Sequence, residues 1–138
     1  MLNNSHMSLN AFDNLRSTHP DWLGVIAAIE RQINRTLRVD PRAVIDDDVI
    51  SQQSQVDPKL VMRLLVELEA WHALVRRLFW LCPEGRGTTS EANSLEEFPA
   101  FIECHRCGQK HSLRSGDVDV RFLPSESLLR EISTTQDR

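Results

Sequence analysis

The sequence predicts an α+β protein in which a helical region precedes a set of short strands. Apolar residues recur at helical spacing from about residue 20 to residue 71, whereas Leu74–Leu81 and Val118–Phe122 are rich in strand-forming residues. The composition, 41% hydrophobic and 26% charged over 138 residues, is typical of a folded globular chain. It excludes a disordered, collagen-like or membrane-embedded class, and one main core is expected.

Helices are expected over three stretches in the first part of the chain, residues 20–36, 47–54 and 58–71. Pro20 and Pro58 suit first helical positions, and the acids at positions 46, 47 and 57 suit helix starts. The β-branched stretch Ala43–Ile45 is expected to pair as a short strand. The apolar face of the third helix consists of Val61, Leu64, Leu65 and Leu68.

The second and third of these helices are separated by about three residues, which is the arrangement of a helix-turn-helix. Leu74–Leu81 follows as a strand long enough for the wing. The order helix, strand, helix, helix, strand resembles that of winged-helix domains. The resemblance implies a winged helix-turn-helix domain over residues 20–81.

The remaining segments are expected to be smaller. Residues 8–19 are polar with scattered apolar residues and are assigned to an N-terminal extension, and residues 85–97 are expected to form a loop. Residues 124–138 are expected to form a short helix and a frayed polar tail from Ser133 onward. Residues 1–7 resemble an expression-tag remnant, which would make Met7 the native start.

The chain contains no apolar run long enough to cross a bilayer and no secretory segment at its start. A cytoplasmic location is therefore expected. Three cysteines in such a chain are expected to be reduced or bound to metal rather than paired in disulfides.

Cys104-His105-Arg106-Cys107-Gly108 has the C-x-x-C-G spacing with which two thiolates chelate one tetrahedral zinc ion. Upstream, Cys82-Pro83-Glu84-Gly85 begins a second such motif, but Gly85 stands where its second cysteine would be. The four-cysteine pattern is therefore incomplete.

With these motifs, residues 82–123 resemble the zinc-ribbon class, inserted in or appended to the winged helix. The resemblance assigns zinc-ligand roles to Cys82, Cys104 and Cys107. The fourth ligand is open between His111, His105 and Glu84, and the C-x-x-C-x-x-x-H spacing favours His111.

Two alternatives to this zinc site stay open. A metal-free ribbon would be held by its core of aromatic residues, expected to be Phe79, Trp80, Phe98, Phe101 and Phe122. A redox dithiol is disfavoured, because the turn at Gly108 does not begin the helix that would activate a thiol. The order of winged helix and ribbon is similar, in architecture alone, to the archaeal transcription factor E family, and architecture does not fix function.

The helix-turn-helix carries six acids between residues 46 and 70, against the two bases Lys59 and Arg63. Such a surface repels phosphate, which disfavours reading of the DNA major groove. Leu60, Met62 and Val66 lie outside the apolar face of the third helix and are expected either to be covered within the chain or to bind a protein partner or a second copy.

Positive charge gathers instead on the wing strand and around the cysteine motifs. Its members are Arg76, Arg77, Arg86, Arg106, Lys110 and Arg114. They are either a solvated surface or a contact for an acidic partner or a nucleic-acid backbone. The sequence thus predicts a protein-interaction adaptor, with a DNA-binding regulator as the alternative.

Catalytic motifs are lacking: the chain has no phosphate-cradling glycine loop, no His-Glu-x-x-His and no Gly-x-Ser-x-Gly. His72 is expected to be structural. Asp46-Asp47-Asp48 could hold a cation, but helix capping explains the acids more simply. A zinc ion with three sulfur ligands would be structural, so neither an enzyme nor a small-molecule substrate is expected.

Overall fold

The computed structural model describes residues 8–136, so the predicted tag remnant at residues 1–7 lies outside it. The predicted α+β class is confirmed, with 51% helix, 21% strand and small antiparallel sheets. The chain forms two compact units, one containing the described residues up to Val75 and from Phe122 onward, and the other Arg76–Arg121. The second unit is therefore an insertion in the chain of the first. None of the described helices is long and apolar enough to cross a membrane.

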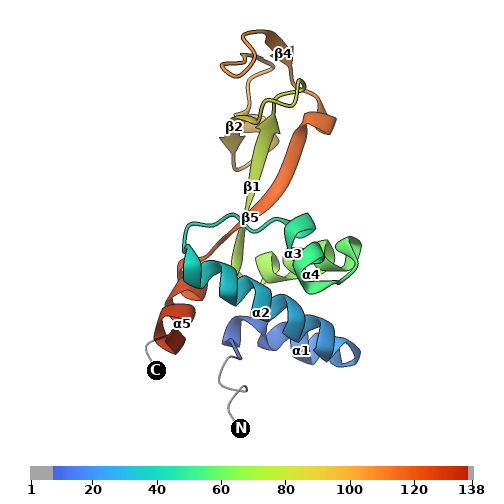
Figure 1. The fold of residues 1–138 in the computed structure, drawn as a ribbon, viewed down its shortest axis with the longest axis vertical. Helices are drawn as coiled ribbons and strands as arrows, with labels where there is room; N and C mark the ends of the chain where they lie inside the picture. The colour runs from blue at the N-terminus through green and yellow to red at the C-terminus, as the bar shows by residue number, and fades with distance from the viewer. Residues whose placement is uncertain (1–7, 137–138) are drawn as a thin grey trace. The chain divides into compact units, whose positions relative to one another are not determined.

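The first unit is helical. Its helices, in chain order, are η2 Asn10–Phe12, α1 Asp13–Thr18, η3 Pro20–Trp22, α2 Leu23–Val39, α3 Asp47–Ser54, α4 Pro58–Ala70 and α5 Glu126–Gln136. Within this unit α1, α3 and α5 each pack against α2, and α4 packs against α3 and also contacts α1 (Figure 1). The predicted frayed tail is wrong for residues 133–136, which continue α5.

The predicted signals at the starts of α3 and α4 are confirmed. The Asp46 carboxylate accepts a hydrogen bond from the Asp48 N–H at 2.9 Å, and that of Asp57 accepts one from the Lys59 N–H at 2.8 Å. Gln55 ends α3 with a φ of 59°. The predicted apolar face of α4 is confirmed as its buried face, with the residues Val61, Leu64, Leu65 and Leu68.

The N-terminal extension is part of the core. Leu9, Phe12 and Leu15 are all buried. Two carboxylates from distant helices hold the backbone there: Glu30 accepts from the Leu9 N–H at 2.6 Å, and Glu131 accepts from the N–H groups of residues 10 and 11 at 2.7 and 2.9 Å. Neither carboxylate was expected from the sequence.

The predicted strand Ala43–Ile45 is reduced to a single antiparallel bridge between Ile45 and Phe122. The Ile45 N–H donates to the Phe122 carbonyl at 2.7 Å, and the Phe122 N–H donates back at 3.0 Å. Both side chains are buried. The bridge ties the segment between α2 and α3 to the strand that precedes α5.

The strands are β1 Leu74–Leu81, β2 Thr88–Ala92, β3 Phe101–Glu103, β4 Lys110–Ser112 and β5 Val118–Pro124, with short helices η4 Leu95–Glu97 and η5 Ser115–Asp117. One sheet has the order β2-β1-β5, and β3 pairs with β4 in another. The predicted loop over residues 85–97 is wrong, because it contains β2 and η4. Pairing with β1 explains β2: Ala92 opposes Leu78, and both are buried.

The second unit has a small core of Leu78, Trp80, Ala92 and Phe98. The rings of Trp80 and Phe98 meet edge to face, with centroids 5.5 Å apart. Three of the aromatic residues predicted for this core lie outside it. Phe79 is buried but faces the Arg121 guanidinium, which lies 5.0 Å from its ring centroid. Phe101 is 57% exposed, with the Lys110 ammonium 4.9 Å from its ring centroid, and Phe122 is buried in the first unit. In β3 the neighbouring Ile102 packs against this core, so the alternation of strand side chains leaves Phe101 on the other face.

Glu30 offers a test of how the N-terminal segment is anchored. Besides the Leu9 N–H, it accepts a hydrogen bond from Arg16 Nη1 at 3.0 Å. Glu30→Ala is expected to lower the free energy of unfolding by about 1–3 kcal/mol, because a buried donor loses its acceptor. Chemical denaturation measures this loss. Glu30→Gln, which keeps one acceptor for Leu9, should cost less, and equal costs would contradict the anchoring role.

The same carboxyl gives a pH dependence. Burial raises the pKa of Glu30 above its ordinary 4.5, although the Leu9 hydrogen bond and Arg16 partly oppose this. The folded chain thus holds the proton more tightly than the unfolded chain. The resulting stabilisation is complete below pH 4.5 and is lost as the pH rises through the raised pKa. This part of the pH dependence should be absent in Glu30→Gln.

Candidate metal centre

The four predicted zinc ligands come from two parts of the second unit. Cys82 directly follows β1, and Cys104 directly follows β3. Cys107 lies in the turn between β3 and β4, and His111 is the central residue of β4. His111 pairs with Ile102 across the hairpin, so the short sheet fixes its position beside the turn.

The turns that follow Cys82 and Cys104 share a hydrogen-bond pattern. The Cys82 N–H donates to the Gly87 carbonyl, and the Cys104 N–H donates to the Gln109 carbonyl, both at 2.8 Å. In each turn a glycine with positive φ donates its N–H back to the cysteine carbonyl, Gly85 at 2.9 Å and Gly108 at 2.7 Å. Such a backbone conformation favours glycine. The glycine lies three residues after Cys82 but four residues after Cys104, so the two turns share the closing bond to the carbonyl five residues on and differ in the loop inside it.

The ligand atoms of Cys82, Cys104, Cys107 and His111 all lie within 4.8 Å of one another. The sulfur of Cys107 and Nε2 of His111 are 3.0 Å apart. Cys82 and Cys104 are buried, and the other two are half-buried. Of the three candidates for the fourth ligand, the structure brings only His111 into this group, since Glu84 and His105 are exposed and lie outside it.

The group fits zinc. A tetrahedral Zn²⁺ binds sulfur at about 2.3 Å and imidazole nitrogen at about 2.0–2.1 Å, which sets neighbouring ligand atoms roughly 3.5–3.8 Å apart. The four side chains need shifts of only a fraction of an ångström to about one ångström to meet that geometry. Three sulfurs and one nitrogen are a donor set that zinc prefers.

The surrounding backbone distinguishes the thiols. Burial alone raises the pKa of Cys104, but the N–H groups of Cys107 and Arg106 donate to its sulfur, and the pKa is lowered overall. The Arg106 N–H lies 3.3 Å from that sulfur. The Gln109 N–H lowers the pKa of Cys107, but burial and the thiols of Cys82 and Cys104 outweigh it and raise that pKa. The thiolate, which is the metal-binding form, is thus better stabilised on Cys104 than on Cys107.

Arg106 connects the two turns. Its Nε donates to the Thr88 carbonyl at 3.1 Å, and its guanidinium lies 3.9 Å from the position of a Cβ at Gly87. The Arg106 side chain thus links the two turns, which the spacing of the motif could not indicate. The predicted contact of Arg106 with an acidic partner or a nucleic-acid backbone stays a prediction.

The other predicted basic residues are in varied surroundings. Arg77 donates to Glu91 at 3.3 Å and to Asn93 at 2.9 Å. Arg76 is half-buried, whereas Arg86, Lys110 and Arg114 are exposed. These six residues are therefore not one uniform basic surface.

The remaining candidate residues lie in the first unit. Leu60 and Met62 are half-buried on α4, and Val66 is 38% exposed. His72 is exposed with a φ of 63°, in the turn after α4. The ligand atoms of Asp46, Asp47 and Asp48 also lie close together. Because the Asp46 carboxylate caps α3, its presence is explained without a bound cation.

Three comparisons with known proteins, through family models, curated proteins and solved structures, gave no match. The interpretation of the metal centre rests on its own residues.

Metal content is the direct test of this centre. The purified protein is expected to hold about one zinc ion per chain, measured by elemental analysis. Cys107→Ser should weaken binding by more than the roughly 10- to 100-fold that loss of an outer-shell partner costs. Removal of zinc with a chelator should disorder the second unit. Near-ultraviolet circular dichroism should then lose the part of the signal that the buried Trp80 contributes.

His111 and His105 provide a matched pair for the fourth ligand. His111→Ala should release zinc, and His105→Ala should retain it, because only the first side chain lies in the group. Equal retention by both variants, or protein that contains no zinc when purified without chelator, would contradict the assignment.

Proposed function

We propose that this protein is a non-catalytic binding module in which a winged-helix domain carries an inserted zinc-ribbon-like subdomain, and that it acts as a protein-interaction adaptor or regulatory subunit. The observation that carries the proposal is the closed set of four ligands, Cys82, Cys104, Cys107 and His111. Four protein ligands leave zinc no open position for a substrate or a reactive water. Zinc at this centre would be structural.

The size of the second unit supports a structural role for the metal. Its buried core has four residues, and β3 and β4 have three residues each. Domains this small commonly need a metal or disulfides, because they bury too little apolar surface to offset the entropy of ordering. Zinc would hold the turn after β1 to the β3–β4 hairpin.

The winged-helix interpretation is supported by the order of elements in and around the first unit. The helices α2, α3 and α4 are followed by β1, and β5 returns to bridge Ile45 between α2 and α3. In this interpretation β1 and β5 are the strands of the wing, and Arg76–Arg121 replaces the tip of the wing.

The surface of α4 favours a protein partner over a DNA groove. Arg63, one of its two bases, lies 3.6 Å from Glu67 and 5.1 Å above the Trp22 ring. Glu67 in turn hydrogen-bonds His19 at 2.8 Å. Arg63 is 61% exposed, but its charge is shared with the Glu67 carboxylate, which reduces its attraction for phosphate. This argues against α4 as a reading helix.

Met62 and Val66 are one turn apart and form a strip on α4, whereas Leu60 lies on a different side of the helix. Val66 is 38% exposed, and Trp71, just after the helix, is 53% exposed. Tryptophan and methionine are enriched at the centre of protein interfaces relative to the rest of the surface. We therefore place the partner contact on the Met62–Val66 strip.

DNA binding through the second unit is the second candidate function. The exposed residues Arg86, Lys110 and Arg114 favour it. However, Lys110 and Arg114 line a cavity of 300 Å³ together with Glu84 and Asp117. Acids within the same hollow reduce its attraction for phosphate.

Val66→Asp tests the adaptor proposal. The exposed substitution should leave the folding midpoint nearly unchanged and remove partner proteins captured from a host extract, identified by mass spectrometry. Val49→Asp, at an apolar position that is 45% exposed on α3, is the matched control and should retain them. Leu65→Ala, in the buried face, should instead cost about 2–5 kcal/mol of stability.

Nuclease treatment separates the two functions in this capture. Partners that resist nuclease and are lost only with Val66→Asp support the adaptor. Partners that disappear with nuclease and bind both variants equally would contradict it and favour nucleic-acid binding.

A DNA titration tests the alternative. On the adaptor proposal, fluorescence anisotropy should show binding no tighter than the non-specific level of about 10⁻⁴–10⁻⁶ M near physiological salt, and binding should weaken steeply with salt. Residual binding should fall in Arg86→Ala/Arg114→Ala and not in Lys59→Ala. A sequence-selective complex tighter than about 10⁻⁸ M that is lost with Lys59→Ala would show that α4 enters the groove.

A further inference from the structure

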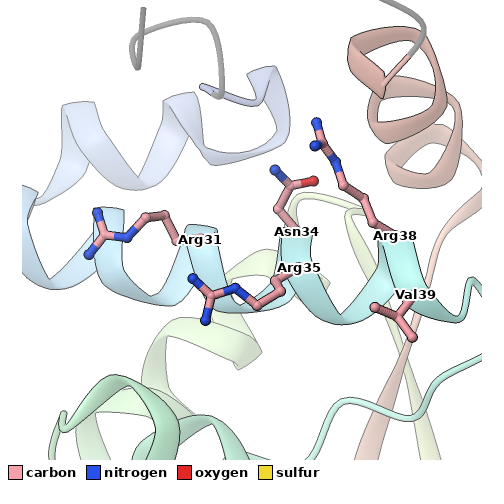
Figure 2. Close-up of a pocket in the computed structure, with 5 residues that line it drawn as sticks. All are labelled: Arg31, Asn34, Arg35, Arg38 and Val39. Atoms are coloured by element: carbon pink, nitrogen blue, oxygen red, sulfur yellow. The ribbon is translucent and has the colours of Figure 1, made fainter.

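The helix α2 carries a cluster of arginines on one face. Arg31, Arg35 and Arg38 line a cavity of 300 Å³ together with Asn34 and Val39, as Figure 2 shows. Their spacings of four and three residues place the arginines on successive turns of the same side. The lining contains no acid.

The charge of this face is not neutralised by its own helix. The single acid of α2, Glu30, is buried and bonded to Leu9 and Arg16. Arg31 and Arg35 are exposed, and neither takes part in an ion pair among residues 8–136. Like charges one turn apart destabilise a helix, so this pair contributes nothing to folding. An anion bound between the Arg31 and Arg35 guanidinium groups would offset their mutual repulsion, because both groups would attract it.

Asn34 adds a polar group to the cavity wall. The residue is 3% exposed, and its Oδ1 has no hydrogen-bond partner within the described part of the chain. In Figure 2 its amide and the Arg38 side chain point to the same side of α2, while Arg31 and Arg35 extend along the helix in a common direction. Buried acceptors without a donor are uncommon. Because this oxygen has almost no accessible surface, the amide would turn toward the cavity to accept a hydrogen bond from a ligand hydroxyl.

We propose that this face binds a phosphate ester that carries a free hydroxyl group, such as a sugar phosphate. The guanidinium groups of Arg31 and Arg35 would hold the phosphate, and Asn34 would accept a hydrogen bond from the hydroxyl. A planar carboxylate is satisfied by one guanidinium fork. A phosphate has three acceptor oxygens and up to two charges, so one group can engage two arginines. The volume is at the lower end for small-molecule sites.

This inference goes beyond the proposed adaptor function. The site lies on α2 in the first unit, and none of its residues belongs to the metal centre or to the Met62–Val66 strip. Either could fail without the other.

The test is an NMR titration of the full ¹⁵N-labelled chain with ribose 5-phosphate, using ribose as the phosphate-free control. Ribose 5-phosphate should shift the amide signals of residues 31–39, and ribose should not. Arg31→Ala/Arg35→Ala should weaken binding at least about tenfold, the effect of losing charge-assisted hydrogen bonds. Both arginines are exposed, so the double variant should fold, which circular dichroism verifies.

A control variant separates the site from net charge. Arg42→Ala/Lys59→Ala removes the same charge at exposed positions outside the cavity and should bind within about twofold of the unmodified chain. Equal weakening in both double variants would overturn the proposal. So would the absence of shifts below about 1 mM ribose 5-phosphate, or equally tight binding of hexaglutamate through the same residues.

A short ribo-oligonucleotide identifies the source of the phosphate. Tighter binding than ribose 5-phosphate, with a steep loss in salt, would support the site with the RNA backbone as its phosphate source. Equal or weaker binding would support a free ester.

Discussion

The second unit depends on bringing residue 82 to residues 104–111 across more than twenty residues of chain. Ordering such a loop costs conformational entropy, and a core built on Leu78, Trp80, Ala92 and Phe98 offsets only part of it. The cysteines lie where the two ends of this loop meet, immediately after β1 and immediately after β3. A metal bound there would hold together the two ends of the loop between Cys82 and Cys104. The turns and the short hairpin of the unit place the ligand atoms at that point.

Both turns have a glycine that bonds back to the cysteine, including the first turn, in which Gly85 stands where a second cysteine would be. Gly85 has a positive φ and donates to the Cys82 carbonyl three residues back, whereas Gly108 donates to the Cys104 carbonyl four residues back. The ligand lost from the first turn is supplied by His111, which the β3–β4 hairpin holds 3.0 Å from Cys107. Arg106 then links the turns without contributing a ligand atom. A metal bound here would take one ligand from the first turn, two from the second and His111 from β4.

Local signals in the sequence were sufficient for the features that depend on near neighbours. The caps at Asp46 and Asp57, the buried face of α4 and the span of β1 are set by residues within a turn or two, and all were predicted. Features that depend on distant pairing were missed. β2 is polar and forms because β1 lies beside it, and Glu30 and Glu131 are anchors only because the fold brings residues 9–11 to them. His111 could be predicted because the C-x-x-C-x-x-x-H spacing is itself a local pattern.

The positively charged residues of the two units have different surroundings, and the difference indicates which of them could bind an external anion. In the second unit, Arg77 and Arg106 are bonded to neighbouring groups, so much of its positive charge is used to hold strands and turns. In the first unit, Arg31 and Arg35 remain exposed on a helix with one buried acid. Around the cysteines Lys110 and Arg114 are also exposed, but they share their cavity with Glu84 and Asp117, whereas the cavity on α2 contains no acid. The arginines of α2 are therefore better suited to an external anion. Their spacing could be read from the predicted first helix. Glu30 is one residue from Arg31 and five from Arg35 and so faces neither along the helix, and whether an acid of another element within residues 8–136 pairs with them depends on the fold.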